Sequence, residues 1–261
     1  FCIDLEQVRQ ALTPQTKAVI GVHLFGQPYS ADLVAFCQEH NLVLIEDAAQ
    51  AHGAKQQFPD GTMRSAGAMG DIGCFSFFPS NNMAVGGEGG MLTTTLSKYE
   101  EHILGITDHG RSPDLEAIQL GSNLRMSEVS ASIGLVQLSN LDTWVENRRQ
   151  NAALFTQALT DHPTISAPAQ RPNTQHAWHQ YCVQTSNPDD LVSHFDSLGI
   201  DTRRYYTTPC HHQLIYKDHP QYAERLENTD VAAHSLVAIP VMHELNNGER
   251  QRIVDALKSY T

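Results

Sequence analysis

The chain has 261 residues, 41% of them hydrophobic, and a formal net charge of −12 at pH 7. This length allows one large or two modest hydrophobic cores, and the acidic charge argues against a nucleic-acid partner, because contacts to phosphates need clustered Lys and Arg. No apolar run approaches the roughly 20 residues of a membrane-spanning helix, so we expect a cytoplasmic protein with no membrane partner.

The first part of the chain carries the clearest architectural signal. A helix-like stretch from Asp4 to Leu12 opens the chain without a preceding strand and without an initiator Met, so we expect that residues upstream have been removed. Residues 18–22 are a β-branched run of the kind buried on both faces of a parallel sheet. Ser30 offers an N-cap to an amphipathic helix, and a second buried strand follows at 42–45. This order predicts a βαβ unit.

The later elements are predicted from apolar spacing and from turn residues. The spacing from Ser127 to Leu159 suits one long helix or two joined helices, and residues 170–173 are a predicted linker. The other predicted elements are strands at 71–78 and 91–95 with a glycine-rich turn at 86–90 between them, a strand at 177–184, a helix from Pro188 to Gly199, a strand at 202–206 and a helix at 248–258.

Asp47 stands directly after the second buried strand. Ligands bind outside the carboxyl ends of the strands in an open parallel sheet, so this position favours a functional carboxylate; a helix N-cap or a solvated loop acid is the alternative. Residues 48–53 are small apart from Gln50 and His52, a composition that lets a flat ligand lie against the backbone. A lone histidine such as His52 is more often a surface or hydrogen-bonded residue than a catalytic one.

A glycine-rich segment and a group of histidines could suggest a phosphate loop and a metal site, but their sequence context argues against both. The glycines at 86–90 precede a strand-like run, and no Gly-Lys-Ser/Thr follows, so we interpret them as a tight turn or a close backbone approach and not as a phosphate loop. His211, His212, His176 and His179 lack the local spacing and acidic partners of a known metal motif, so no metal site is predicted. The five scattered cysteines form no Cys-x-x-Cys pair, which indicates reduced thiols.

Several longer motifs together cover essentially the whole chain. They are Val-His-Leu-Phe-Gly-Gln-Pro (22–28), Glu-Asp-Ala-Ala-Gln-Ala-His-Gly-Ala (46–54), Gly-Asp-Ile-Gly-Cys-Phe-Ser-Phe-Phe-Pro-Ser (70–80) and Ser-Asn-Leu-Arg-Met-Ser-Glu (122–128), with shorter matches at 86–91, 109–111, 132–138 and 202–213. In this pattern the chain resembles the DegT/StrS family of sugar aminotransferases, which are fold-type I enzymes that use pyridoxal 5'-phosphate (PLP).

The resemblance implies an α/β fold with a mainly parallel central sheet flanked by helices, plus a smaller C-terminal α/β domain. Residues 1–140 would be the remainder of the large PLP-binding domain, and residues 141–261 the linking helix and the small domain. The implied activity is the transamination of nucleotide-linked keto-sugars for amino-sugar and polysaccharide biosynthesis. Glutamate would be the amino donor, and PLP or pyridoxamine 5'-phosphate (PMP) the cofactor.

The family's site roles also carry over to positions of this chain. Asp47 would pair with the pyridine nitrogen of the cofactor and keep it protonated. Gln50 would lie over the ring or near its O3 oxygen, and Ser76 would donate to the phosphate. Asn123 would reach the phosphate of a neighbouring subunit, which implies a homodimer with shared active sites. His52 would touch cofactor or substrate.

The chain departs from the family pattern at two places. Members carry Ser-Lys-Asn after Phe-Phe-Pro, and here the triplet is Ser80-Asn81-Asn82. The missing lysine is both nucleophile and general base, and an amide is neither, so Asn81 predicts an inactive or trapped chain. A dehydratase branch of the family carries histidine at this position, which is a possible base, but asparagine is not a base. Intact relatives also extend further at the front, so we expect half of the cofactor pocket to be absent.

Three functions are therefore open at this point. In the first, the protein is an aminotransferase and Asn81 is an engineered change or a sequence error. In the second, Asn81 is natural and the chain is a non-catalytic regulatory paralogue that binds PLP, PMP or an aminosugar adduct. In the third, the chain is a truncated, cofactor-free fragment kept folded by its dimer partner.

Overall fold

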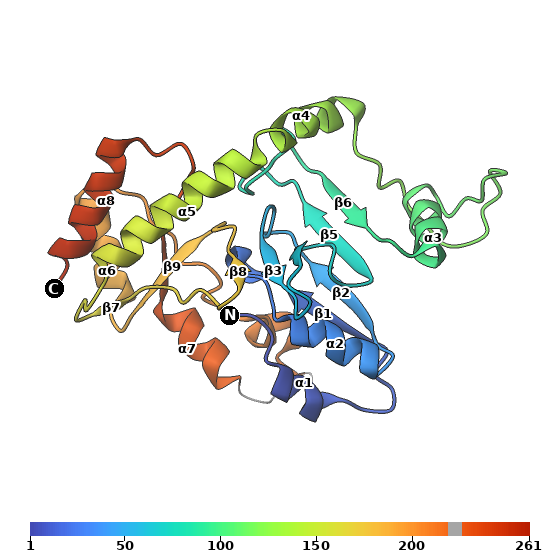
Figure 1. Ribbon diagram of the computed structural model, residues 1–261, viewed down its shortest axis with the longest axis horizontal. Helices are drawn as coiled ribbons and strands as arrows, with labels where there is room; N and C mark the ends of the chain where they lie inside the picture. The colour runs from blue at the N-terminus through green and yellow to red at the C-terminus, as the bar shows by residue number, and fades with distance from the viewer. Residues whose placement is uncertain (219–225) are drawn as a thin grey trace. The chain divides into compact units, whose positions relative to one another are not determined.

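The computed structural model describes residues 1–218 and 226–261, and these divide into two compact units (Figure 1). The first contains Phe1–Val145 and Gln170–His179, and the second contains Glu146–Ala169 and Gln180–Thr261. The domain boundary at residue 140 stays a prediction. None of the helices in the described ranges is both long and apolar enough to cross a bilayer.

A four-stranded sheet lies at the centre of the first unit (Figure 1). Its order is β1 (Ala18–Val22), β2 (Val43–Asp47), β5 (Ile72–Ser76) and β6 (Gly90–Thr93); the first three are parallel, and β6 is antiparallel to β5. α2 (Ala31–Glu39) joins β1 to β2. The predicted βαβ unit is confirmed, and so is the α/β fold class.

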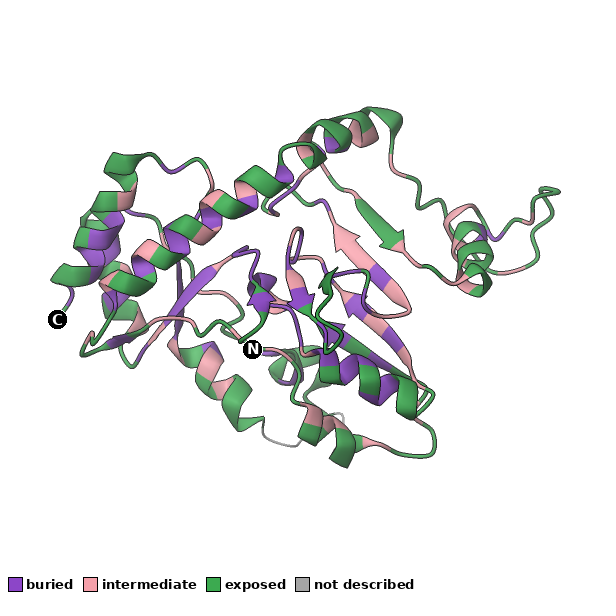
Figure 2. Cartoon of the chain, viewed as in Figure 1, coloured by how far each residue is buried: buried purple, intermediate pink, exposed green. Residues whose placement is uncertain are grey.

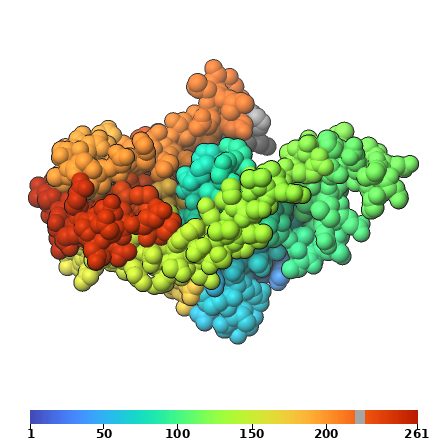
Figure 3. All heavy atoms as spheres, turned by 90° about the horizontal axis from the view of Figure 1, so that it is seen from above, coloured from blue at the N-terminus to red at the C-terminus, as the bar shows by residue number. Residues whose placement is uncertain are grey.

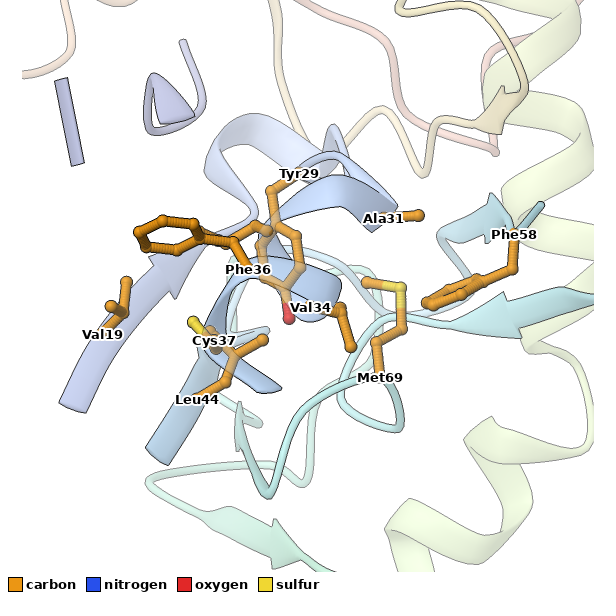
Figure 4. Close-up of a cluster of buried hydrophobic side chains, with 10 residues drawn as sticks. Val19, Tyr29, Ala31, Val34, Phe36, Cys37, Leu44, Phe58 and Met69 are labelled. Atoms are coloured by element: carbon orange, nitrogen blue, oxygen red, sulfur yellow. The ribbon is translucent and has the colours of Figure 1, made fainter. Parts of the chain in front are cut away.

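Helix α2 covers one face of this sheet. Leu33 and Phe36 of α2 pack with Val19 of β1 and Leu44 of β2, and each of these side chains is at least nine-tenths buried. Figure 4 labels Phe36, Val19 and Leu44 in this cluster. Full burial of such a side chain contributes roughly 1.5–3 kcal/mol. The prediction that residues 18–22 are buried on both faces is wrong, because β1 is an edge strand and Ile20, on the opposite face from Val19, is 60% exposed.

The remaining elements of the first unit surround this sheet. A smaller antiparallel sheet has the order β4-β3-β8, and the predicted helical region at 127–159 is two helices, not one. The bounds are α1 (Leu5–Ala11), η1 (Leu24–Gly26), β3 (Lys55–Gln57), β4 (Met63–Ser65), α3 (Ser97–Thr107), α4 (Glu128–Leu138), α5 (Leu141–Ala158), which continues into the second unit, and β8 (Thr174–Gln175).

The second unit is built on an antiparallel sheet in the order β10-β9-β7, whose two longer strands are almost wholly buried (Figure 2). The predicted strand at 202–206 is wrong: this segment forms a single bridge, from Arg203 to Ala238. The bounds are β7 (Ile165–Ser166), β9 (Tyr181–Thr185), α6 (Pro188–Ser197), η2 (Cys210–His212), η3 (Leu214–Tyr216), α7 (Glu227–Ser235), β10 (Leu236–Ile239) and α8 (Asn247–Ser259).

Candidate active site

Asp47 and Ser76 lie at the same edge of the central sheet. Each is the last residue of its strand, β2 and β5, and these strands are parallel neighbours in which Asp47 is paired with Cys74. Paired residues share a face, and residues two apart on one strand also share a face. Asp47 and Ser76 therefore lie on one face of the sheet, opposite the face that α2 covers, at the carboxyl end where ligands bind in such sheets.

Local hydrogen bonds orient both side chains. Oδ1 of Asp47 accepts from the backbone N–H of Ala49 at 3.1 Å, and the carboxylate is half-buried. Oγ of Ser76 accepts from the backbone N–H of Phe78 at 3.3 Å. A hydroxyl that accepts one hydrogen bond still has its own proton to donate. This edge therefore presents a carboxylate and a hydroxyl donor.

Asn81 is held against the end of β5. Its Nδ2 donates to the carbonyl oxygen of Ser76 at 2.7 Å, and its backbone N–H closes a turn onto the carbonyl of Phe78 at 2.9 Å. The structure thus brings Asn81 into direct contact with the backbone of Ser76. A carboxamide bonded in this way has neither a nucleophilic atom nor a basic one.

Gln50 lies in the loop after β2, and its side chain forms a hydrogen bond to the turn at residues 24–26. Its Oε1 accepts from the backbone N–H of Phe25 at 2.7 Å. Phe25 has a φ of 59°, a conformation that non-glycine residues seldom adopt. A Cβ at the neighbouring Gly26 would meet backbone atoms of Gln50 and Trp178 at 3.1 and 3.0 Å. The amide oxygen of Gln50 is therefore bound to the 24–26 turn. The predicted role of Gln50 toward a cofactor stays a prediction.

His52 lies in the core, on the opposite face of the sheet from Ser76. It is 3% exposed, and its ring packs against the rings of Phe75 and Phe77 at centroid distances of 5.3 and 5.8 Å. Phe75 alternates with Ser76 along β5, so the two side chains lie on opposite faces. Burial lowers the pKa of His52 to about 4, and neither ring nitrogen has a hydrogen-bond partner among the described residues. This placement favours a packing role.

Asn123 is separate from the other predicted residues. It is exposed and forms an isolated bridge with Asp108, and its Oδ1 accepts from Nε of Arg125 at 3.0 Å. Arg125 in turn forms an ion pair with Asp108 at 3.0 Å. Asn123 therefore belongs to an outward-facing polar cluster, and the structure does not join it to Asp47 or Ser76.

Sequence reasoning missed Glu46, the residue that fixes the end of β2. This carboxylate is fully buried and accepts hydrogen bonds from the backbone N–H groups of Gly67, Met69 and Gly70 and from Nε2 of His23, at 2.6 to 2.9 Å. Burial alone would raise the pKa of Glu46, but these hydrogen bonds outweigh it and hold the pKa below its usual value. The sequence signal that could have indicated a buried Glu46 is the position of an acidic residue within an apolar strand.

Comparison with known proteins identifies the family. Residues 1–258 match the DegT/DnrJ/EryC1/StrS aminotransferase family. The chain belongs to this family. It is 34% identical to a protein of Geobacillus stearothermophilus named pleiotropic regulatory protein, over all of this chain and 69% of that protein.

Two further comparisons concern a sugar aminotransferase and a solved structure. The chain is 32% identical to a dTDP-3-amino-3,4,6-trideoxy-alpha-D-glucose transaminase of Streptomyces venezuelae, covering 99% of the chain and 67% of that enzyme. The crystal structure of DesV from S. venezuelae, in complex with a ketimine intermediate, superposes with a TM-score of 0.92 at 32% identity, over 98% of the chain and 68% of DesV. The family comprises PLP-dependent aminotransferases of nucleotide sugars.

The donor set at the β2–β5 edge fits PLP or PMP held without a covalent bond. A carboxylate suits a protonated ring nitrogen, and a hydroxyl donor suits a phosphate oxygen. Asp47 and Ser76 supply these two groups on one face of the sheet. Asn81 supplies no amine, so the set does not fit a cofactor attached to a side chain at that position.

Proposed function

We propose that this protein is a PLP-dependent aminotransferase of nucleotide-linked keto-sugars by descent, with glutamate as amino donor, and that the chain with Asn81 holds its cofactor without completing the reaction. The observation that carries the proposal is the Asp47 and Ser76 pair at the carboxyl edge of β2 and β5, with Asn81 hydrogen-bonded beside it.

Each of these residues has a distinct part in the proposal. Asp47 would hold a proton on the ring nitrogen, because a carboxylate at that atom favours its charged form. Ser76 would bind the phosphate through its hydroxyl proton. PLP, when bound, supplies an electron sink for bonds at the substrate carbon that carries nitrogen. With Asn81 no side chain at the lysine position accepts or returns the proton at that carbon, so turnover stops there.

Restoring the lysine tests the proposal. We expect Asn81→Lys to retain PLP through dialysis and, after borohydride reduction, to gain the mass of one reduced cofactor, while the wild type binds PLP reversibly, loses it on dialysis and gains no such mass. Asn81→Gln, which keeps an amide, is the matched control and should behave as the wild type. A folded Asn81→Lys protein that takes up no cofactor would contradict the proposal.

A second candidate is a binding or regulatory function with no turnover. The observation that favours it is that a relative 34% identical to this chain bears the name pleiotropic regulatory protein. This candidate predicts that PMP binds the wild type in a calorimetric titration and that Asn81→Lys, although it attaches PLP, converts no keto-sugar. The cofactor-free alternative predicts that neither form binds PLP or PMP.

We also infer a homodimer, in which Asn123 serves the partner's site. The support is apolar surface: α4 and the segment before it, which are coloured green in Figure 3, carry large aliphatic side chains that are exposed. Contiguous exposed apolar surface on a globular protein typically marks an interface. The residues concerned are Leu115, Ile118, Leu120, Leu124, Val129, Leu135, Val136 and Leu138, each 53% to 95% exposed.

A further inference from the structure

Two histidines and an aspartate converge in the second unit, and the proposed function gives none of the three a role. His211 and His212 form the end of the short helix η2, and Asp230 lies in the first turn of α7. Their potential ligand atoms all lie within 4.8 Å of one another. His212 and Asp230 are far apart in the sequence, and the short helix η3 lies between them. The cluster therefore forms only when the chain folds.

Both imidazoles lie close to the same carboxylate oxygen. Nε2 of His211 lies 3.1 Å from Oδ1 of Asp230, and Nε2 of His212 lies 3.6 Å from that atom. The His211 side chain is 6% exposed, the Asp230 side chain 22% and the His212 side chain 46%. The cluster is therefore anchored on a buried side and open to solvent on the other.

These separations are close to those of a tetrahedral metal site. With metal–ligand bonds of about 2.0 Å, the ligand atoms of tetrahedral Zn²⁺ lie about 3.3 Å apart. The two distances to Asp230 bracket that value. Small side-chain rotations would therefore replace the hydrogen bond between His211 and Asp230 by bonds to one central ion.

We propose that His211, His212 and Asp230 bind a divalent transition-metal ion, with Zn²⁺ as the natural probe. Two neutral imidazoles and one carboxylate are a donor set that Zn²⁺ accepts, and Ca²⁺ and Mg²⁺ prefer oxygen ligands alone. The fourth position faces solvent on the His212 side and would hold water or an anionic group of a small molecule.

The competing reading is a hydrogen-bonded cluster that only fastens η2 to α7. In that case Asp230 would join the two elements through His211 without any ion, and its loss would lower stability alone. The two readings differ in one measurable quantity, the affinity for a metal.

The experiment uses the whole protein, free of any affinity tag and stripped with a chelator. Zn²⁺ is titrated in competition with a chromophoric chelator, and Co²⁺ is added separately to record its visible ligand-field bands. We expect one bound ion per chain and an intense tetrahedral Co²⁺ spectrum. Loss of an outer-shell partner of a metal typically costs 10–100-fold in affinity, so loss of a direct ligand should cost at least about 100-fold.

The variants are His212→Ala and Asp230→Asn, each checked for folding by circular dichroism. His102→Ala removes an exposed imidazole on α3 and should leave the Zn²⁺ affinity unchanged. The proposal is overturned if the wild type binds no stoichiometric Zn²⁺, or if either folded ligand variant binds Zn²⁺ as tightly as the wild type.

Discussion

At the scale of single residues, neighbouring residues of β2 and of the loop after it have different environments. Asp47 faces the open side of the sheet, while Glu46 and His52 lie in the interior. For Asp47 and Glu46 the alternation of the strand produces this division, because adjacent side chains point to opposite faces. A motif that contains all three residues therefore mixes the proposed cofactor-binding residue, Asp47, with two buried residues.

His52 makes stability depend on pH. Burial lowers its pKa to about 4, whereas the unfolded chain has an ordinary histidine value of about 6.5. Between these values the unfolded state binds more protons than the folded state, so stability falls as the pH drops from about 6.5 to 4. We expect a loss of up to about 3 kcal/mol from this residue.

Urea unfolding at a series of pH values measures this effect. His52→Leu removes the titrating group and keeps an apolar side chain between the two phenylalanine rings. The slope of stability against pH in this range should therefore flatten in the variant. An equal slope in both proteins would show that folding does not change the pKa of His52, which would contradict the prediction.

At the scale of elements, buried hydrogen bonds fix the end of β2. Glu46 ties this strand to the 67–70 turn and to His23, and the His23 ring stacks on Tyr29 at 4.3 Å. The carboxylate thereby sets the backbone position from which Asp47 projects. We therefore expect the candidate site to depend on buried contacts on the opposite face of the sheet.

Glu46→Gln tests how strongly these buried hydrogen bonds stabilise the fold. The amide nitrogen of Gln would face backbone donors that now meet a carboxylate oxygen, so a buried donor loses its partner. We expect a loss of about 2–4 kcal/mol in the free energy of unfolding. Glu39→Gln, at the exposed end of α2, should change stability by less than about 0.5 kcal/mol. Equal effects of the two substitutions would contradict a special role of Glu46.

At the scale of the whole molecule, the exposed apolar surface of α4 predicts association. Val129 and Val136 are two turns apart on this helix and are 72% and 67% exposed. Charged groups at the centre of an interface are strongly unfavourable, so Val129→Glu with Val136→Glu should raise the dimer dissociation constant at least about 100-fold.

Light scattering coupled to size exclusion, over a range of protein concentrations, measures this constant. Val231→Glu is the matched control, because Val231 is 62% exposed on α7 and belongs to the other unit. It should leave the mass unchanged. A wild-type protein that is monomeric at all concentrations would refute the predicted homodimer.

The sequence by itself determined the elements whose signals are local. The apolar spacing of α2 with its Ser30 cap, the β-branched runs of β1 and β2, and the last helix follow from neighbours a few residues apart. The linear motifs likewise determined the family, because they occur in order along the chain.

Only the tertiary structure decided which side chains meet and which face they share. The strand predicted at 202–206 reduces to one bridge, because pairing depends on a partner far along the chain. The position of Asp230 beside His211 and the burial of Glu46 among backbone donors also join residues about 20 positions apart. Such contacts depend on how elements pack in space, and no local spacing encodes that.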